Sequence, residues 1–261
     1  MPTVTNGSVD IHYEDTGGDG PAVLFSHGFL MDHTMFDQQI AALRDRYRCI
    51  TWDERGFGGT EARGPFTYWD SADDAVALLD HLGIDAAVFV GMSQGGFLSL
   101  RAALANPERV TAIVLIDSAA DTDDEATLQG YKGMLHVFEH GSEDERAAVF
   151  EVVSGLILGD ATLGAEWIPK WGQIPRGQLA LAGGALLGRD DISDRVGEIM
   201  CPILAIHGTA DQAISMDRVE ALAASASDHR GIVRIDGAAH APNMTNPDQV
   251  NAALEQFLGS L

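Results

Sequence analysis

A serine flanked by two glycines stands where an apolar run changes to a helical pattern. The segment Gly91-Met92-Ser93-Gln94-Gly95 follows the strand-like run AAVFVG and precedes a helical pattern over 94–105. Glycine on both sides of a serine indicates a turn so tight that side chains there would collide with the backbone. Strand, sharp turn and helix in this order form a nucleophile elbow, which raises a serine hydroxyl clear of the sheet. The segment therefore predicts that Ser93 is a nucleophile.

A serine hydroxyl needs a general base and a group that orients this base, and the C-terminal third offers both. His240 comes just after the strand-like run GIVRID, and Asp211 comes just after PILAIHG. Both lie where strands end, which is the edge where sites of open α/β sheets collect. The chain order Ser93, Asp211, His240 is also the order expected for an elbow nucleophile. Asp117, which ends the run VTAIVLID, is the competing acid, and we prefer Asp211 because its placement is the commoner one.

Composition and charge favour a globular protein that acts on small molecules. The chain has 261 residues, 46% of them hydrophobic, which suits one large domain with a buried core. Its formal net charge is -23, so nucleic acid and anionic membranes would be repelled and are not expected as partners. The first residues lack the basic and apolar regions of an export signal, which predicts a cytoplasmic protein. No His or Cys spacing is typical of a zinc site, and we predict no metal.

Short β-branched runs alternate with longer helical patterns along most of the chain. This alternation predicts an α/β fold with a mostly parallel central sheet of about eight strands and helices on both faces. Asn6-Gly7 between two strand-like runs is a hairpin signal, so the sheet is expected to open with antiparallel strands.

The alternation stops between Asp117 and Cys201, where the chain has helical patterns but no strand. A structureless loop of that length is unusual in a compact domain. We predict a helical lid over 121–197, inserted between strands 6 and 7, on a core domain made of 1–120 and 198–261.

Five segments resemble, in the right order, motifs of the α/β-hydrolase fold superfamily. They are SHGFLMDHTMF, WDERGFGGTEA, GMSQGGF, HGTADQAI and GAAHAPNMTNPDQV. Within that superfamily the chain is most similar to bacterial aryl esterases, related perhydrolases and enol-lactone hydrolases. The resemblance implies that the backbone N–H groups of Phe29 and Gln94 form an oxyanion hole, and that His27 shapes the loop beside it.

Apolar side chains around the nucleophile and in the lid predict the character of the substrate. Met92 and Phe97 flank Ser93, and the lid is rich in large apolar residues. The candidates for the pocket are Met92, Phe97, Phe138, Trp167 and Trp171. The two tryptophans stand four apart, so they are equally compatible with packing inside the lid.

These residues predict a serine hydrolase that cleaves carboxylic esters or lactones of small apolar substrates through an acyl-enzyme. The mechanism needs no metal and no organic cofactor. The alternatives are a C–C bond hydrolase, a perhydrolase or an amidase with the same triad, or a small-molecule receptor that keeps the fold without turnover. Haloalkane dehalogenases and epoxide hydrolases are disfavoured, because their relatives carry aspartate at the position of Ser93. The pattern assigns no oligomeric state.

Overall fold

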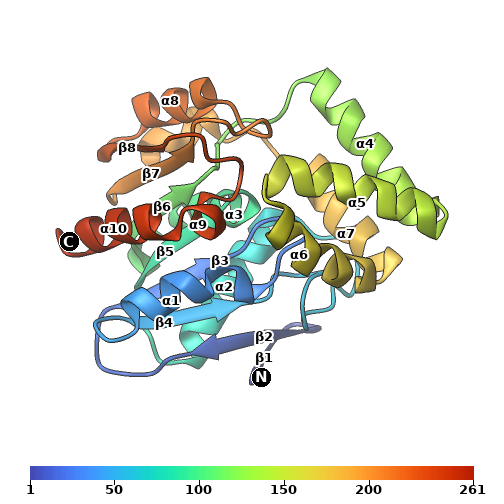
Figure 1. Cartoon of the computed structure of the whole chain (residues 1–261). Helices are drawn as coiled ribbons and strands as arrows, with labels where there is room; N and C mark the ends of the chain where they lie inside the picture. The colour runs from blue at the N-terminus through green and yellow to red at the C-terminus, as the bar shows by residue number, and fades with distance from the viewer.

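The computed structural model describes all 261 residues and places one eight-stranded sheet at the centre of the molecule (Figure 1). The strand order across the sheet is β1-β2-β4-β3-β5-β6-β7-β8. The strands are β1 (Thr3–Asn6), β2 (Val9–Asp15), β3 (Ala22–Ser26), β4 (Arg48–Trp52), β5 (Ala87–Met92), β6 (Val110–Ile116), β7 (Ile203–Gly208) and β8 (His229–Ile235). β1 and β2 form the expected antiparallel hairpin, β2 also pairs antiparallel with β4, and all other pairs are parallel. The predicted fold class is confirmed.

Helices cover both faces of this sheet. The helices outside the segment between β6 and β7 are α1 (Asp37–Leu43), α2 (Tyr68–His81), α3 (Gln94–Ala105), α8 (Met216–Ser225), α9 (Pro242–Thr245) and α10 (Pro247–Leu258). α1 and α10 lie side by side in front of the sheet in Figure 1, while α2 and α3 pack together behind it. The central strands β5, β6 and β7 are apolar on both sides because helices bury both faces, as a parallel sheet requires.

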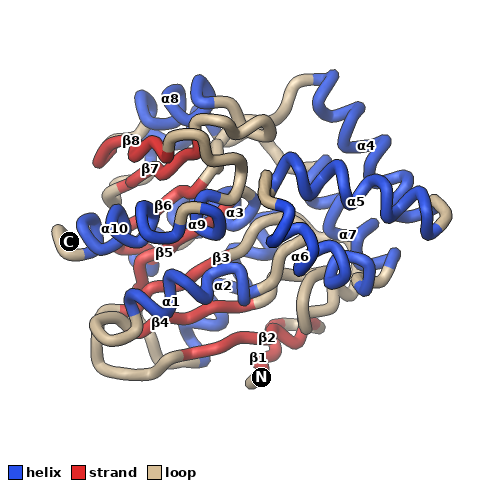
Figure 2. Tube along the Cα trace, in the orientation of Figure 1, coloured by secondary structure: helices blue, strands red, loops and turns tan.

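The segment of the chain that connects β6 to β7 forms four further helices, which gather at one end of the sheet (Figure 2). They are α4 (Glu125–His140), α5 (Glu143–Ile157), α6 (Ala161–Gln173) and α7 (Arg176–Leu187). α4 packs mainly on α7 and α5 mainly on α6, so the group consists of two helix pairs. Their buried side chains are continuous with the core of the sheet. The division of the chain into a core and a lid at residues 121 and 197 stays a prediction.

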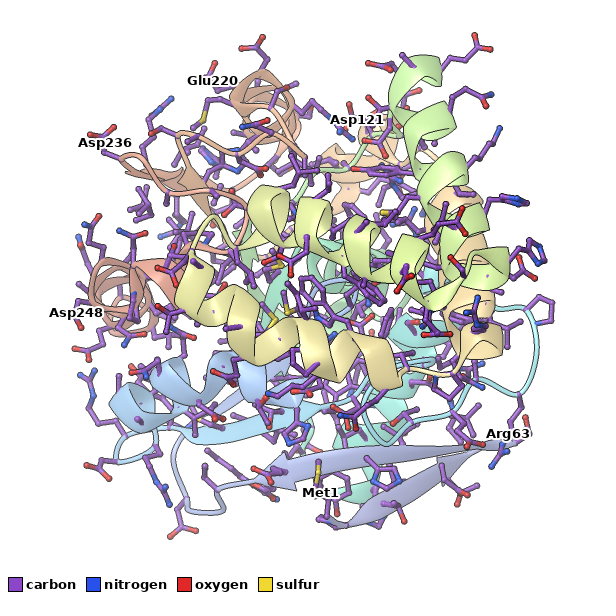
Figure 3. The ribbon with its side chains drawn as sticks, turned by 45° about the vertical axis from the view of Figure 1, so that its right-hand side comes forward. Met1, Arg63, Asp121, Glu220, Asp236 and Asp248 are labelled. Carbon is purple, nitrogen blue, oxygen red and sulfur yellow. The ribbon has the colours of Figure 1, made fainter.

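The acidic residues that dominate the charge lie largely on the outside. Glu220, Asp236 and Asp248 are exposed and stand at the periphery of the molecule in Figure 3. None of the helices has the length and apolar character that crossing a bilayer would demand.

Candidate active site

Ser93 occupies a strained turn between β5 and α3. Its backbone has φ 51° and ψ −114°, a positive φ that is uncommon for a residue other than glycine. The turn is closed so tightly that a Cβ on Gly91 would collide with the backbone of Gly95, and one on Gly95 would collide with the carbonyl oxygen of Ser26. Backbone strain of this kind costs about 1–3 kcal/mol and is found where the surrounding structure holds a functional group in place. The two glycines therefore have the steric role that their spacing predicts.

Replacing Gly95 by alanine is expected to destabilise the protein by more than about 2 kcal/mol, because the new methyl group meets backbone that cannot rotate away. The measurement is the free energy of unfolding in urea. Gly184→Ala is the matched control: Gly184 is exposed on α7, and a Cβ there meets nothing within 4 Å. This control should stabilise the protein by about 0.5–1 kcal/mol through helix propensity. Equal free energies for the two variants would contradict the steric explanation of the elbow.

His240 and Asp211 meet in the loops that follow β8 and β7. The Nδ1 atom of His240 lies 2.8 Å from Oδ2 of Asp211. Oδ1 of Asp211 accepts hydrogen bonds from the backbone N–H groups of Ala213 at 2.8 Å and Ile214 at 3.2 Å. Since a carboxylate only accepts, Nδ1 of His240 carries the hydrogen, and no protein group bonds to Nε2. His240 is thus oriented as a base whose free nitrogen is Nε2.

Burial raises the pKa of Asp211, but the charge of His240 and the hydrogen bonds that Asp211 accepts lower it by more. The pKa of this carboxyl therefore lies below its ordinary value, and Asp211 is ionised at neutral pH. A buried carboxylate beside Nδ1 stabilises the imidazolium that forms when His240 takes a proton.

Asp117, the competing acid, directly follows β6 beside this pair but makes no hydrogen bond to His240. Its Oδ1 accepts the backbone N–H of Gly208 at 3.0 Å, and its backbone has φ 44°. The hydrogen bond from His240 goes to Asp211, as we expected from the sequence. Asp117, Asp211 and His240 each bring a ligand-type atom within 4.8 Å of the others.

The loop after β3 lies against the elbow and carries Phe29. A Cβ on Gly28 would lie 3.7 Å from Cβ of Ser93, and the N–H of Phe29 has no acceptor within the protein. Gln94 is the first residue of α3, so its N–H has no partner inside the helix. Both N–H groups are available to an oxygen bound beside Ser93.

The side chain of Gln94 belongs to a buried network that sequence analysis missed. Its Nε2 donates to Oε2 of Glu54 at 2.9 Å, and its Oε1 lies 3.3 Å from the hydroxyl of Tyr68. Burial raises the pKa of Glu54 well above its ordinary value. Glu54 stands inside the motif WDERGFGGTEA, and only the packed structure shows that it reaches the residue after the nucleophile.

His27 is a structural residue of the loop after β3. Its Nδ1 lies 2.8 Å from the carbonyl oxygen of Gly28, which can only accept, and its Nε2 accepts the backbone N–H of Glu54 at 2.9 Å. One donor and one acceptor define a neutral ring, and burial lowers the pKa of His27. Nδ1 is used within the loop after β3 and Nε2 joins this loop to the one after β4, so both nitrogens have structural roles.

A cavity of about 400 Å³ connects Ser93 and His240 with the first two helices of the inserted segment. Its walls are mostly apolar, with two stripes of side chains from α4 and α5. The lining residues are Phe29, Ser93, Phe97, Asp123, Thr127, Gly130, Tyr131, Met134, Val149, Val152, Val153, Leu156, Ile157, Leu186, Arg189, Gln212, Ala213, Ile214 and His240. Val152 and Leu156 are also exposed to solvent, so the cavity opens beside α5.

Of the five side chains expected to line the pocket, only Phe97 does so. Met92 lies under the Gly28 turn, where a Cβ on that glycine would collide with its sulfur. Phe138 stacks on Phe150 with ring centroids 4.7 Å apart, and Phe150 in turn contacts Trp171. Trp167 is buried in α6. These four assignments are corrected: Phe138 and Trp171 pack on Phe150 within the inserted helices, Trp167 is buried outside the cavity lining, and Met92 lies against the loop behind the elbow.

The chain belongs to the α/β hydrolase fold family, whose model matches residues 21–247. It is an α/β hydrolase, in agreement with its sheet order and its elbow.

Relatives match along nearly the whole chain. A Synechocystis protein with the provisional name non-heme chloroperoxidase is 29% identical over 99% of this chain and 100% of its own. 3-Oxoadipate enol-lactonase 2 of Acinetobacter baylyi is 27% identical over 98% of this chain and 96% of its own. The solved structure of a thermophilic esterase from Thermogutta terrifontis has a TM-score of 0.89 and 27% identity, covering 100% of this chain and 99% of the esterase.

Proposed function

We propose that the protein is a serine hydrolase that cleaves uncharged carboxylic esters or lactones through an acyl-enzyme. The proposal rests on one observation: Ser93 and His240 line the same apolar cavity, and Nδ1 of His240 is hydrogen-bonded to Asp211. An esterase and an enol-lactonase among the similar proteins support an acyl-transfer reaction.

In the first half of the reaction, Oγ of Ser93 attacks the acyl carbon and Nε2 of His240 takes its proton. The negative oxygen of the tetrahedral intermediate accepts hydrogen bonds from the N–H groups of Phe29 and Gln94, each worth about 3 kcal/mol of transition-state stabilisation. His240 then gives the proton to the leaving alcohol oxygen. In the second half, water attacks the acyl carbon while Nε2 of His240 takes its proton. His240 then gives this proton to Oγ of Ser93 as the bond between Oγ and the acyl carbon breaks and the acid leaves.

We also propose that residues 121–197 act as the lid of this site. The side chains of α4 and α5 provide most of the apolar wall that faces Ser93. Enclosure by these helices excludes water from the acyl group and strengthens the hydrogen bonds to the oxyanion.

The direct test is labelling with a fluorophosphonate, followed by a series of p-nitrophenyl esters. One label per chain, on Ser93, and a burst of p-nitrophenol support the acyl-enzyme. Specific binding of esters without turnover would favour the receptor alternative, and a label on another residue would refute the assignment of the nucleophile.

Acyl-chain length is expected to raise kcat/KM on neutral esters until the cavity is full. Each methylene buried in an apolar pocket contributes about 0.8 kcal/mol, or up to about fourfold in kcat/KM. The measurement compares acetyl, butyryl, hexanoyl and benzoyl esters with a hemisuccinate, at low and high salt. The hemisuccinate should have the lowest kcat/KM of the series, because the net charge of -23 repels anions. Salt screens this repulsion and should raise the kcat/KM of the hemisuccinate. Equal values for the neutral esters, or a preference for the hemisuccinate, would contradict an apolar acyl site.

A second acceptor is supported by the Synechocystis relative, whose name denotes a peroxidase. Hydrogen peroxide can attack the acyl-enzyme in place of water and release a peracid from the same site. Peroxide-dependent peracid formation that disappears in Ser93→Ala would establish this reaction. If the wild type hydrolyses the ester but forms no peracid in the presence of hydrogen peroxide, this second reaction is refuted.

A further inference from the structure

Two carboxyl groups lie together at the buried centre of the site. Asp117 and Asp211 have fully buried side chains, and a carboxyl oxygen of each lies within 4.8 Å of one of the other. No lysine or arginine forms an ion pair with either of them; their only ionisable basic neighbours within 4 Å are His207 and His240. Two adjacent carboxylates without a cation cannot both stay ionised in a buried place.

The hydrogen-bond donors are divided unequally between the two carboxyl groups. Asp211 accepts three hydrogens, two from backbone N–H groups on Oδ1 and one from His240 on Oδ2. Asp117 accepts one, from Gly208 on Oδ1, and its buried Oδ2 has no donor in the protein. A bare oxygen in that place is costly unless it carries a hydrogen of its own.

His207 does not supply the missing positive charge. Its Nε2 lies 3.0 Å from the carbonyl oxygen of Ile214, which can only accept, so the hydrogen of the neutral ring is on Nε2. Its Nδ1, 3.2 Å from Oδ1 of Asp117, is then without a hydrogen. Burial lowers the pKa of His207, which keeps the ring neutral. Neither ring nitrogen of His207 is a donor to Asp117.

We propose that Asp117 is a neutral carboxylic acid in the working enzyme, and that its O–H donates to the carboxylate of Asp211. The pair then carries one negative charge and one shared hydrogen. Asp117 is a positioning residue: through Asp211 it holds the carboxylate that orients His240, and it does not touch the substrate. The inference rests on the proposed function, because it assigns a role within that triad.

The surroundings of Asp117 agree with this protonation state. Burial, the charge of Asp211 and their mutual hydrogen bond raise the pKa of Asp117 well above its ordinary value, against a smaller lowering by the N–H of Gly208. The other titratable groups around the pair are His207 and His240. Beyond them, the charge of Asp211 contributes to the raised pKa of Tyr131 of α4, and the charge of Arg234 of β8 contributes to the lowered pKa of His207. The positive φ of Asp117 is a further constraint that directs its side chain, and asparagine tolerates the same conformation.

The test compares Asp117→Asn with Asp117→Ala. An asparagine amide is neutral and can donate to Asp211, so we expect kcat/KM within about threefold of the wild type and an unmoved acidic limb of its pH profile. Alanine removes the donor, so kcat should fall about tenfold with KM unchanged. If Asp117 were ionised, Asp117→Asn would remove a negative charge near His240 and shift the acidic limb down by about one pH unit or more. That shift, or equal losses in the two variants, would overturn the proposal.

Infrared difference spectroscopy tests the shared hydrogen without any substrate. The spectrum of the wild type minus that of Asp117→Asn at pH 7 should contain the C=O stretching band of a protonated carboxyl. The frequency of this band should shift in D₂O, because the carboxyl hydrogen exchanges for deuterium. Glu54→Gln is the matched control, because Glu54 is the other buried carboxyl with a strongly raised pKa and should lose a different band. A carboxylate band in place of the protonated one refutes the proposal. A wild type that hydrolyses no ester refutes the proposed function instead, and this spectrum still decides the state of Asp117.

Discussion

Ser93→Ala is expected to lower kcat for ester hydrolysis by about 10⁶-fold and to leave the fold intact. The change deletes one hydroxyl at the wall of the cavity and opens no space in the core. In serine hydrolases the loss of the nucleophile costs about as much as the loss of the whole triad, since base and acid have nothing left to activate. The residual rate comes from the oxyanion hole and from binding. The measurements are the rate with p-nitrophenyl esters and the free energy of unfolding.

Ser99→Ala is the control for this experiment. Ser99 lies on the same helix, and its hydroxyl donates to the carbonyl oxygen of Gly95 at 2.6 Å without reaching the cavity. This variant should keep its activity and its single fluorophosphonate label. More than a small percentage of wild-type activity in Ser93→Ala would exclude the acyl-enzyme mechanism as written.

The central sheet and the elbow were predictable because short-range patterns determine them. Buried parallel strands read as apolar runs, and the sharp turn at Ser93 needs glycine at two fixed positions, so both are visible within a few residues of sequence. The placement of Asp211 and His240 at neighbouring strand ends follows from the rule that parallel strands end at one edge of the sheet.

The pocket was not predictable to the same degree, because helical periodicity does not say what an apolar face contacts. Phe138, Trp167 and Trp171 are large apolar residues of the inserted segment, yet Phe138 and Trp171 pack on Phe150 and Trp167 is buried away from the cavity. The smaller side chains of α4 and α5 line the cavity instead. Which stripe faces the cavity depends on how the two helix pairs dock, a long-range feature that no local pattern carries.

The protonation of buried acids is a second feature that sequence patterns do not contain. Glu54 follows Asp53 in the chain, and both follow β4, but their pKa values move in opposite directions. Burial raises the pKa of both, whereas the hydrogen bond and charge of His33 bring that of Asp53 below its ordinary value. Only the partners supplied by folding distinguish the two carboxyl groups.

Asp211→Asn is expected to lower kcat by about 10⁴-fold with little change in KM. The amide can present N–H to Nδ1 of His240, which then takes the hydrogen onto Nε2 and can no longer accept the proton of Ser93. The imidazolium that forms during attack also loses the negative charge beside it. The geometry of the loop is otherwise kept, since the amide oxygen can still accept from the backbone N–H groups of Ala213 and Ile214.

The comparison with Asp117→Asn decides which acid belongs to the triad. Both variants replace a fully buried carboxyl by an amide of the same shape, so a general effect of the substitution on folding would appear in both. Because His240 is hydrogen-bonded to Asp211, we expect the large loss of activity in Asp211→Asn alone. Activity is measured at several pH values, so that a shifted pH profile is not mistaken for a lower kcat. A larger loss in Asp117→Asn would assign the acid to the end of β6 and would refute Asp211 as the residue that orients His240.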